Sequence, residues 1–537
     1  MSAFTTQTII GNFRDNSHQP LGPVQKTIEI TNPATNLPIG SVVQSTVSDV
    51  DAAVASCSSA LHGWSVLTTL KSRANLALRL HSLIASNSPA LAALIVAENG
   101  KNLSEALADV AKGLETVAYA ASLASNPVAM GSVLPVSRGV ACEDRCVPLG
   151  VVAAVVPFNF PAMVPLWTVP IALTVGNCVV LKPSEKVPMT FSFVCDLIKE
   201  AGYPPGVFNT VNGEGAEVVN ALIDHDDVRA ITFVGSTPVA RLVSNRCKGI
   251  NKRCLALGGA KNHLVALEDC DVEGTVRDVT ASAFGCAGQR CMAASVLIVV
   301  GKQDELLQRL KEEVSKIKLG VEKGEMGPVI TPDSLANVRG YLDSAEKFGS
   351  ELLVDGRKLF VSPASTSLPN STGNWIGPSI ILHNGFGPNE RALSEEIFGP
   401  VLSVIRVETW AEAIKIENGS PFGNAACVYT QRGGAADWFV GRFRAGMLGV
   451  NVGIPVPREP FAFGGLAGTD SKFGGYNDIT SEGAVGFFTD KIKVTTRWPV
   501  PVELLGEGES GEGKKRKREK EKEKGGVEDA ANFNGKM

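Results

Sequence analysis

The chain has 537 residues, of which 44% are apolar and 20% are charged, and its formal net charge is −4. This composition is typical of a globular enzyme with two or three domains and excludes a disordered or fibrous chain. Since no apolar run reaches the roughly 18 to 20 residues that a membrane span needs, we expect a soluble protein.

The N-terminal fifth of the chain is predicted to be helical after a short leader. Residues 1–20 contain neither a secretory apolar segment nor an arginine-rich transit helix, although an atypical mitochondrial presequence stays compatible with them. Apolar side chains then recur at three- and four-residue spacing in "DVDAAVASCSSALHGW" (residues 49–64) and again over residues 70–101. This spacing predicts amphipathic helices.

From residue 150 the pattern changes to short apolar runs that alternate with helical stretches. The runs are "GVVAAVVPF", "NCVVLKPS", "FNTVNG", "AITFVGS" and "HLVAL". Near-continuous apolar strands between helices predict a parallel sheet that is covered on both faces, as in dinucleotide-binding folds. A second α/β segment follows, with "ASVLIVVG", a helix in "DELLQRLKEEVSKIK", and the strands "VLSVIRV" and "ACVYT".

Two predicted strands end in residues that suit a nucleotide. The strand "AITFVG" leads through Gly235 and Ser236 into a helix, whose free N–H groups and dipole would favour a phosphate, although a purely structural turn has the same pattern. The strand "CVVLKPSE" ends in Lys182, Ser184 and Glu185, at the sheet edge where open α/β sheets bind ligands. Since Glu185 would accept ribose hydroxyls and repel a 2′-phosphate, the sequence favours NAD over NADP.

The segment "GCAGQRCMAAS" (residues 285–295) holds two cysteines among small residues. The chain has 11 cysteines, an odd number, with no CxxC pair and no Cys/His cluster of zinc-like spacing, which argues against a disulfide framework and a metal site. A reducing compartment fits this usage best. Cys286 and Cys291 are each either a nucleophile or a small core residue.

The motifs "PFNFP", "LKPSE", "FVGSTPV", "GQRCMA" and "EIFGP" occur in the order and spacing of the aldehyde dehydrogenase superfamily, which the chain resembles over residues 31–498. The details "PFNFPAMVPLW", "GAKNH", "AGQRCMA" and "GVNVGIPVP" are similar to its CoA-acylating methylmalonate-semialdehyde dehydrogenase branch. The resemblance implies an α/β fold with a Rossmann-type NAD domain, an α/β catalytic domain and a β oligomerisation arm.

By this resemblance Cys291 is the nucleophile and Cys286 is structural. Asn159, with the backbone N–H of Cys291, would hold the oxyanion of a thiohemiacetal before hydride transfer to NAD leaves a thioester. Arg290 and a helix expected to begin at the cysteine would favour the thiolate. Alternatively, Asn159 caps a turn and Arg290 is a surface cation.

The resemblance also implies cofactor contacts outside the two strand ends. Glu396 would hold the nicotinamide ribose, Phe398 would pack on the ring, and Phe158 is counted among the cofactor-binding residues. For Glu396, the alternative is a carboxylate buried in a turn.

The route of thioester release is predicted from a missing carboxylate. Hydrolytic members of the family carry a glutamate base in an "LELGG" segment, where this chain reads "LALGGAK" (residues 255–261). Without a base for water, the thioester should persist until the thiolate of CoA attacks it. The resemblance therefore implies an acyl-CoA product, with CoA as co-substrate.

The substrate expected from the resemblance is methylmalonate or malonate semialdehyde, which would give propionyl-CoA or acetyl-CoA with loss of carbon dioxide, as in valine catabolism. Its carboxylate needs a fixed cation, best a forked arginine. Arg290 matches one family arginine, but Lys112 in "DVAKGL" stands where the family has a second. Lys112 either binds the carboxylate less well, marks a different acid, or is a solvated helix cation.

Two other functions stay open at this level. One is an NAD-dependent dehydrogenase of a different aldehyde, with a free acid as its product. The other is a non-catalytic or nucleic-acid-binding protein, suggested by the run "KKRKREKEKEK" (residues 514–524), with eight Lys/Arg and three Glu. The intact Cys291, Asn159 and Glu396 disfavour the second, and a solvated tail explains the basic run.

We predict four parts. They are an NAD-binding domain over residues 1–132 and 148–263, a catalytic domain over 264–482, an oligomerisation arm over 133–147 and 483–499, and a disordered charged tail over 500–537. Strands are expected in "VLPVSRGVACEDRCV" and in "GFFTDKIKVTTRW" (residues 486–498). Since an exposed sheet edge must pair, we expect a homodimer or homotetramer. The compartment stays open: mitochondrial by resemblance, cytoplasmic for want of a clear presequence, or nuclear through the basic run.

Overall fold

The computed structural model describes residues 8–22, 25–137, 140–358, 372–385, 390–475 and 477–498. The predicted charged tail, with its basic run, lies outside the described residues. The chain divides into two compact units. The main unit comprises Met1–Met130 and Cys146–Asp490, and the small unit comprises Gly131–Arg145 and Lys491–Met537.

The first sheet of the main unit has six strands in the order β10-β9-β8-β11-β12-β20. Five of them are parallel, as the apolar runs predicted: β8 (Val151–Val155), β9 (Cys178–Lys182), β10 (Phe208–Thr210), β11 (Val228–Val234) and β12 (Arg253–Leu257). The strand order turns back at β8, which lies between β9 and β11. Ligands of open α/β sheets bind at such a reversal, beyond the carboxyl ends of the strands.

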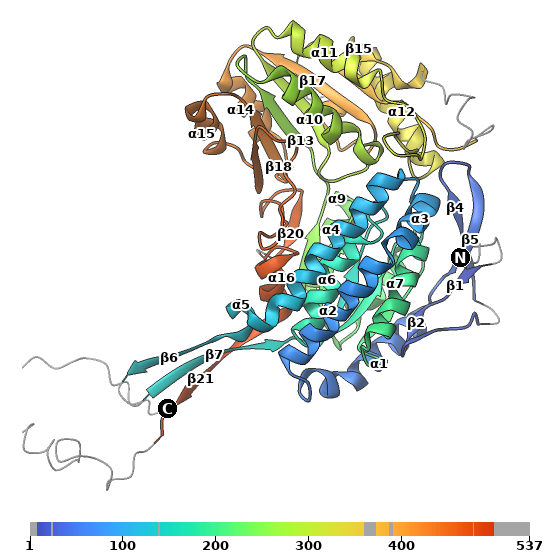
Figure 1. The fold of residues 1–537 in the computed structure, drawn as a ribbon, viewed down its shortest axis with the longest axis vertical. Helices are drawn as coiled ribbons and strands as arrows, with labels where there is room; N and C mark the ends of the chain where they lie inside the picture. Colours follow the sequence, from blue (N-terminus) through green and yellow to red (C-terminus); the bar gives the residue numbers. More distant parts are fainter. Residues whose placement is uncertain are drawn as a thin grey trace, which may run out of the picture. The chain divides into compact units, whose positions relative to one another are not determined.

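Helices connect these strands and cover the sheet (Figure 1). They are α6 (Met163–Thr174), α7 (Pro188–Ala201), α8 (Gly215–Asp224) and α9 (Thr237–Gly249). The sixth strand, β20 (Lys472–Gly474), comes from far along the chain and runs antiparallel to β12. Every residue of α6 is buried, because this helix is packed between the sheet and the N-terminal helices.

The N-terminal region supplies four more helices: α1 (Val47–Ser65), α2 (Leu70–Ser86), α3 (Ser88–Asn99) and α4 (Leu103–Ser122). The periodicity predicted the first three, whereas α4 lies outside the predicted helical segments. Thr46, Thr69 and Asn102 cap three of them. No single helix in the described residues is long and apolar enough to cross a membrane, and the α2–α3 pair, bent by 67°, passes that test by length and composition only. Short strands precede these helices: β1 (Ile9–Ile10), β2 (Phe13–Arg14), β3 (Ser17–His18), β4 (Thr27–Asn32) and β5 (Leu37–Val43).

The second sheet of the main unit has seven strands in the order β15-β16-β17-β14-β13-β18-β19. They are β13 (Asn262–Ala266), β14 (Ala294–Val300), β15 (Glu351–Val354), β16 (Ser379–His383), β17 (Val401–Val407), β18 (Ala425–Tyr429) and β19 (Met447–Val450). Only β15 is antiparallel to its neighbour. Residues 258–261 alone join β12 of the first sheet to β13 of the second, so the "LGGAK" segment lies between the sheets.

Further helices pack on this second sheet (Figure 1). They are α10 (Val272–Phe284), α11 (Asp304–Val314), α12 (Pro332–Lys347), α13 (Arg391–Ser394), α14 (Trp410–Asn418) and α15 (Gly433–Val440). The described chain therefore has the mixed α/β architecture that the sequence predicted, with two largely parallel sheets in the main unit.

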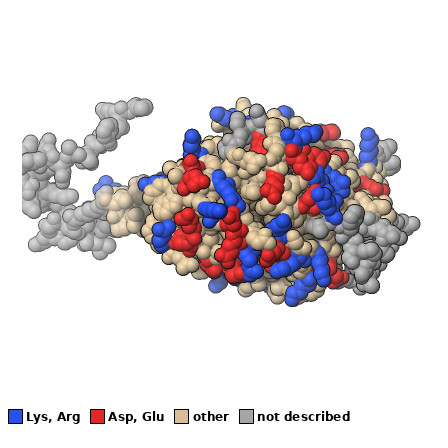
Figure 2. All heavy atoms as spheres, turned by 90° about the horizontal axis from the view of Figure 1, so that it is seen from above, with Lys and Arg blue, Asp and Glu red and all other residues tan. Residues whose placement is uncertain are grey.

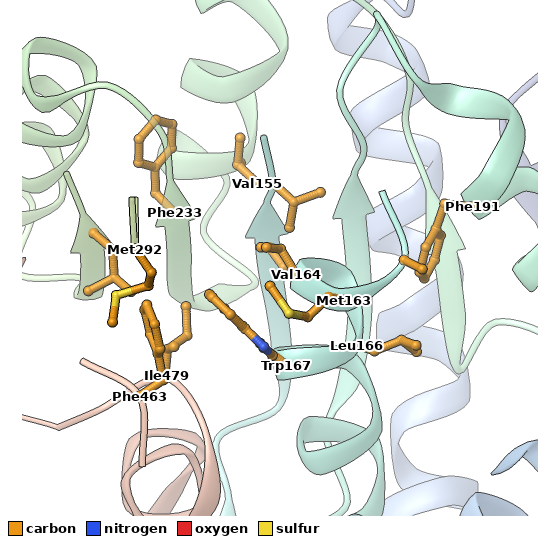
Figure 3. Packing of buried hydrophobic residues seen from close by; sticks show 14 of the residues in the cluster. Val155, Met163, Val164, Leu166, Trp167, Phe191, Phe233, Met292, Phe463 and Ile479 are labelled. Carbon is orange, nitrogen blue, oxygen red and sulfur yellow. The ribbon is translucent and has the colours of Figure 1, made fainter. Parts of the chain in front are cut away.

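The main hydrophobic core includes strands of both sheets and residues of the helices α2, α4 and α6. Figure 3 shows Val155 of β8 and Phe233 of β11 near Trp167 of α6 and Phe463. The Trp167 and Phe463 rings have centroids 4.5 Å apart. Close packing of this kind holds rotamers in place, so side chains that border this core have fixed directions. Figure 2 shows acidic and basic residues interspersed on the viewed face, which fits the small net charge.

The small unit contains a three-stranded sheet in the order β21-β7-β6, formed by β6 (Ser132–Ser137), β7 (Val140–Pro148) and β21 (Thr489–Thr496). Strands were predicted in these segments, but the last begins at Thr489 and not at residue 486. The preceding residues belong to α16 (Ser481–Phe488), whose Ser481, Ala484, Val485 and Phe488 are buried at the three- and four-residue spacing of a helix. In β6, Val133, Leu134 and Val136 are exposed.

Candidate active site

Cys291 lies in a turn between the second sheet and α10. The chain leaves α10, passes through a short 3-10 turn at Gly285–Gly288, and enters β14 at Ala294. The helix expected to begin at Cys291 is therefore absent, and that prediction was wrong. The buried apolar residues that follow the cysteine extend directly into the central strand β14, so no helix dipole points at the thiol.

The surroundings of Cys291 raise its pKa. Burial and the nearby charge of Glu396 raise the pKa of the thiol to about 12, and the backbone N–H groups of Cys291 and Met292 and the charge of Arg290 lower it only in part. The Arg290 charge favours the thiolate, as expected, but burial outweighs it. Cys291 must lose its proton before it can act as a nucleophile.

Two asparagines fix the backbone at Cys291. Asn262 Nδ2 donates to the carbonyl oxygens of Cys291 and Ala293, both at 2.8 Å, and Asn424 Nδ2 donates to the Cys291 carbonyl at 3.0 Å. Asn262 begins β13 and Asn424 directly precedes β18, so both are held by the central strands of the second sheet. The direction of the Cys291 side chain is consequently set by the sheet and not by the turn alone.

The two thiols of the motif differ in surroundings. Both line the same cavity, but Cys286 is 8% exposed and its backbone has φ of +53°. Its N–H donates to Glu105 Oε1 at 2.6 Å, and burial raises the pKa of its thiol to about 11. Cys291 is more exposed and has two backbone N–H groups facing its sulfur. The geometry therefore favours Cys291 as the reactive thiol.

Asn159 lies next to this turn. It follows β8, is 5% exposed, and donates from Nδ2 to the Gln289 carbonyl at 3.0 Å, two residues before Cys291. A carboxamide nitrogen carries two N–H groups, so this hydrogen bond leaves one of them for another acceptor. The structure thus brings Asn159 to the nucleophile candidate, although the two are 132 positions apart in sequence.

A cavity of about 690 Å³ opens onto Cys291. Its lining comes from four separate segments: α4, the start of α6, residues 281–292, and residues 452–463. Figure 3 shows part of its apolar wall, with Met163 and Trp167 of α6 near Met292 and Phe463. A volume of this size accommodates a small aldehyde together with part of a larger co-substrate.

The acidic side chains that line this cavity already have partners. Glu105 accepts from the Cys286 N–H, and Asp109 binds Lys101 Nζ at 2.7 Å and the Met163 N–H at 2.8 Å. Glu115 pairs with Lys112. Residues 255–261 carry no carboxylate, as the sequence shows. In the described lining, no carboxylate is therefore free to activate a water at Cys291.

The two predicted substrate cations both line the cavity. Arg290 donates from Nη2 to the carbonyls of Ala281 and Ser282 at 2.7 and 2.8 Å, and its buried Nε has no partner among the described residues. Lys112 binds Glu115 and donates to the Pro457 carbonyl at 3.0 Å. Arg290 thus keeps an unused donor, whereas the charge of Lys112 is paired.

The predicted nucleotide residues lie at the carboxyl edge of the first sheet. Lys182 ends β9, and its Nζ lies 3.2 Å from Glu185 Oε2, while Ser184 is buried. Burial alone would raise the pKa of Glu185, but the Lys182 charge and a backbone hydrogen bond outweigh it and the net pKa is lowered. Glu185 is therefore ionised at neutral pH and suits ribose hydroxyls better than a 2′-phosphate.

Gly235 and Ser236 occupy the corresponding position after β11. Ser236 is the N-cap of α9 and makes no side-chain capping bond, so the first-turn N–H groups of α9 stay available to an anion. A Cβ on Gly235 would lie 2.7 Å from the Phe233 ring, so a larger residue here would have to displace that ring. These features fit a dinucleotide phosphate.

A chain of contacts links this edge to Cys291. Thr237 Oγ1, at the start of α9, accepts from the Gly259 N–H at 2.9 Å, and Glu396 Oε1 accepts from the neighbouring Ala260 N–H at 3.0 Å. Burial raises the pKa of Glu396 to about 7. The predicted cofactor residues near the sheet edge and near the cysteine thus belong to one continuous region.

The predicted aromatic residues lie in the same region. The Phe158 and Phe398 rings are 5.8 Å apart in an edge-to-face arrangement, and Lys186 Nζ lies 5.6 Å from the Phe158 ring. Phe158 therefore lies between the end of β9 and the Glu396 segment. This arrangement fits a ligand that extends from the sheet edge to Cys291, as a dinucleotide would.

Comparison with known proteins identifies the family. Residues 22–490 match the model of the aldehyde dehydrogenase family. The chain belongs to this family. It is an enzyme of the aldehyde dehydrogenase type, and its fold is the one its sequence motifs indicated.

Among curated relatives, "Malonate-semialdehyde dehydrogenase 2" of Bacillus mycoides (strain KBAB4) is 40% identical over 477 residues, which cover 88% of this chain and 95% of the relative. The human "Methylmalonate-semialdehyde/malonate-semialdehyde dehydrogenase [acylating], mitochondrial" is 39% identical over 477 residues, which cover 88% of this chain and 86% of the relative.

Among solved structures, methylmalonate-semialdehyde dehydrogenase (DddC) from Oceanimonas doudoroffii superposes with a TM-score of 0.87 at 36% identity, over 92% of this chain and 99% of that one. A Sinorhizobium meliloti 1021 protein assigned to the same enzyme class, solved in complex with NAD, gives a TM-score of 0.87 at 33% identity, over 93% and 99% of the chains.

Three residues at the site were missed by sequence reasoning. Asn262 lies inside the quoted "GAKNH" motif, so its position was visible but its role as a backbone clamp was not. Asn424 has no signal in its surroundings. Arg458 lines the cavity directly after "GVNVGIPVP", and its cationic side chain beside a site motif was the available clue.

Proposed function

We propose that this enzyme catalyses the NAD-dependent, CoA-acylating oxidation of malonate or methylmalonate semialdehyde to acetyl-CoA or propionyl-CoA, with loss of carbon dioxide. The observation that carries the proposal is the cavity at Cys291, which Arg290 also lines and in whose described lining every carboxylate has a partner. The names and identities of the relatives support the same substrate class.

The first step is assigned to Cys291 and Asn159. The sulfur of Cys291, once deprotonated, attacks the aldehyde carbon, so that a C–S bond forms and the carbonyl oxygen becomes an oxyanion. Asn159 Nδ2 and the Cys291 N–H would donate to this oxygen. When bound, NAD accepts a hydride from the former aldehyde carbon, which leaves an acyl thioester on Cys291.

The cofactor contacts are assigned to the two strand ends. Lys182, Ser184 and Glu185 would hold a ribose, and Gly235 and Ser236 would contact the phosphates at the start of α9. Glu396, Phe158 and Phe398 would hold the reacting end of the dinucleotide against Cys291. The ionised Glu185 supports NAD as the cofactor.

The release step follows from the charges in the cavity. Because Glu105, Asp109 and Glu115 are engaged, no carboxylate of the described cavity lining is free to activate water, whereas the CoA thiolate needs no base. Its attack forms the acyl-CoA and returns the Cys291 thiolate. Arg290 would bind the substrate carboxylate, which lies β to the carbonyl carbon. When this carboxylate leaves the acyl thioester as carbon dioxide, the electron pair of the C–C bond stays as a thioester enolate, and Cα then takes a proton from water.

An oligomer is part of the proposal. In β6 of the small unit, Val133, Leu134 and Val136 are 64%, 60% and 56% exposed, which is costly for a strand that meets only water. We assign this strand to an interface between copies of the chain, in a homodimer or homotetramer, whose size sedimentation or light scattering would give.

The proposed reaction is tested by following NADH with purified full-length protein, NAD and malonate semialdehyde, with and without CoA. We expect steady turnover only when CoA is present, an acyl-CoA product by mass spectrometry, and a higher kcat/KM for NAD than for NADP. Steady NADH formation without CoA, with a free acid as the product, would contradict the acylating mechanism.

A further inference from the structure

The cavity contains a third cation, Arg458, to which no role has been assigned so far. Its side chain is exposed, it lines the cavity together with Arg290 and Lys112, and in the described part of the chain no hydrogen bond or ion pair involves its guanidinium. An arginine fork without partners, facing a cavity that holds a reactive thiol, is available to an anionic ligand.

The backbone on each side of Arg458 is anchored, although its side chain is free. The Pro457 carbonyl accepts from Lys112 Nζ at 3.0 Å. On the other side, Glu459 accepts from Thr116 Oγ1 at 3.3 Å and from the Ser481 hydroxyl. Two residues of α4 and one of α16 thus hold this segment in place, so the guanidinium starts from a fixed point on the cavity wall.

Lys112 is poorly suited to the role of carboxylate ligand. Its ammonium is already paired with Glu115 and bonded to the Pro457 carbonyl, and a substrate carboxylate would have to displace one of these contacts. In this geometry Lys112 instead holds Pro457, the residue before Arg458. Arg458, on the loop that Lys112 holds, can therefore supply the bidentate guanidinium that a lysine lacks.

We propose that Arg458 is a specificity-determining residue that binds the carboxylate of the semialdehyde together with Arg290, and that Lys112 positions it through Pro457. This inference rests on the proposed function, because it requires a substrate that carries a carboxylate. The phosphate groups of CoA are also anionic and would suit the same guanidinium. The test below distinguishes them from the substrate carboxylate.

The test compares Arg458→Gln and Arg458→Lys with the wild type on malonate semialdehyde and on propanal, an uncharged aldehyde of the same chain length. We expect Arg458→Gln to lower kcat/KM for malonate semialdehyde by about 10- to 100-fold and to leave propanal within about twofold. Arg458→Lys should recover part of the loss, since it keeps the charge without the fork. The KM for CoA should not change.

Two results would overturn the inference. Equal losses on both aldehydes would mean that Arg458 supports the fold of the loop, and a rise only in the KM for CoA would assign it to the CoA phosphates. If the proposed function itself is wrong, the wild type will show no preference for malonate semialdehyde over propanal. That result is distinct from either of the two above, because it needs no variant.

The positioning role of Lys112 has a separate readout in a double-mutant cycle. If Lys112 acts through Arg458, adding Lys112→Met to Arg458→Gln should cost less than about twofold beyond Arg458→Gln alone. If Lys112 binds the carboxylate itself, the two losses in kcat/KM for malonate semialdehyde should multiply, and the positioning role would be wrong.

Discussion

The nucleotide edge of the first sheet and the aldehyde cavity at Cys291 are built in different ways. At the edge, each group of polar residues follows one buried strand: Lys182, Ser184 and Glu185 follow β9, and Gly235 and Ser236 follow β11. Parallel topology brings such strand ends together. The cavity, in contrast, is lined by four segments that no single sheet aligns.

This difference separates two kinds of function. The edge presents ionised Glu185 and free helix N–H groups, which is suited to a ligand shared by many enzymes. On the proposed function, the cavity selects the aldehyde and the route by which the acyl group leaves, and the pairing of Lys112 with Glu115 occupies two of its charged groups. Changes in the cavity should therefore alter chemistry, and changes at the edge should alter cofactor choice.

The largest expected effect comes from the thiol itself. Cys291→Ala should lower kcat by about 10⁴-fold or more, because the covalent step is lost. Cys286→Ala is a matched control, since Cys286 lines the same cavity and has a similarly raised pKa. It should keep kcat within about tenfold. NADH formation measures both, and equal losses in the two variants would contradict the assignment.

Asn159 should come next. Asn159→Ala is expected to lower kcat by about 10²- to 10³-fold with little change in KM, as is typical when one oxyanion donor is lost. Asn159→Asp has the same shape but no N–H donor, so it should lose at least as much. An active Asp variant would show that the side chain shapes the turn near Gln289 and donates nothing to the reaction.

The raised pKa of Cys291 gives a pH dependence with a definite sign. Since burial and Glu396 raise the pKa to about 12, the thiolate is a minor species from pH 7 to 9, and its fraction should grow about tenfold per pH unit. Alkylation of Cys291 by iodoacetamide, followed by peptide mass spectrometry, should rise about 100-fold over this range. A plateau below pH 8 would mean that the pKa is lowered instead.

The smallest effect is expected at the nucleotide edge. On the proposed function Glu185 binds the ribose, so Glu185→Gln should raise KM for NAD about tenfold while kcat for the aldehyde changes little. The preference for NAD over NADP should shrink by a similar factor. Steady-state kinetics with both nucleotides checks this, and an unchanged preference would remove Glu185 from cofactor recognition.

The sequence predicted the sheet, the strand ends and the cysteine segment because these depend on local patterns: apolar runs, glycine turns and short motifs. It could not predict the direction of Lys112, since the Pro457 carbonyl that holds it is 345 positions away. It also could not predict how strongly burial raises the pKa of Cys291. Arg290 is adjacent in sequence, but burial, which no motif encodes, determines the pKa.

The central claim is that the site forms a thioester on Cys291 and cannot hydrolyse it. The most direct measurement mixes enzyme, NAD and malonate semialdehyde without CoA and follows both NADH and the mass of the Cys291 peptide. We predict one NADH per active site, an acyl group that persists on Cys291, and its prompt loss when CoA is added. Continued NADH formation without CoA, and an unmodified peptide, would contradict the account.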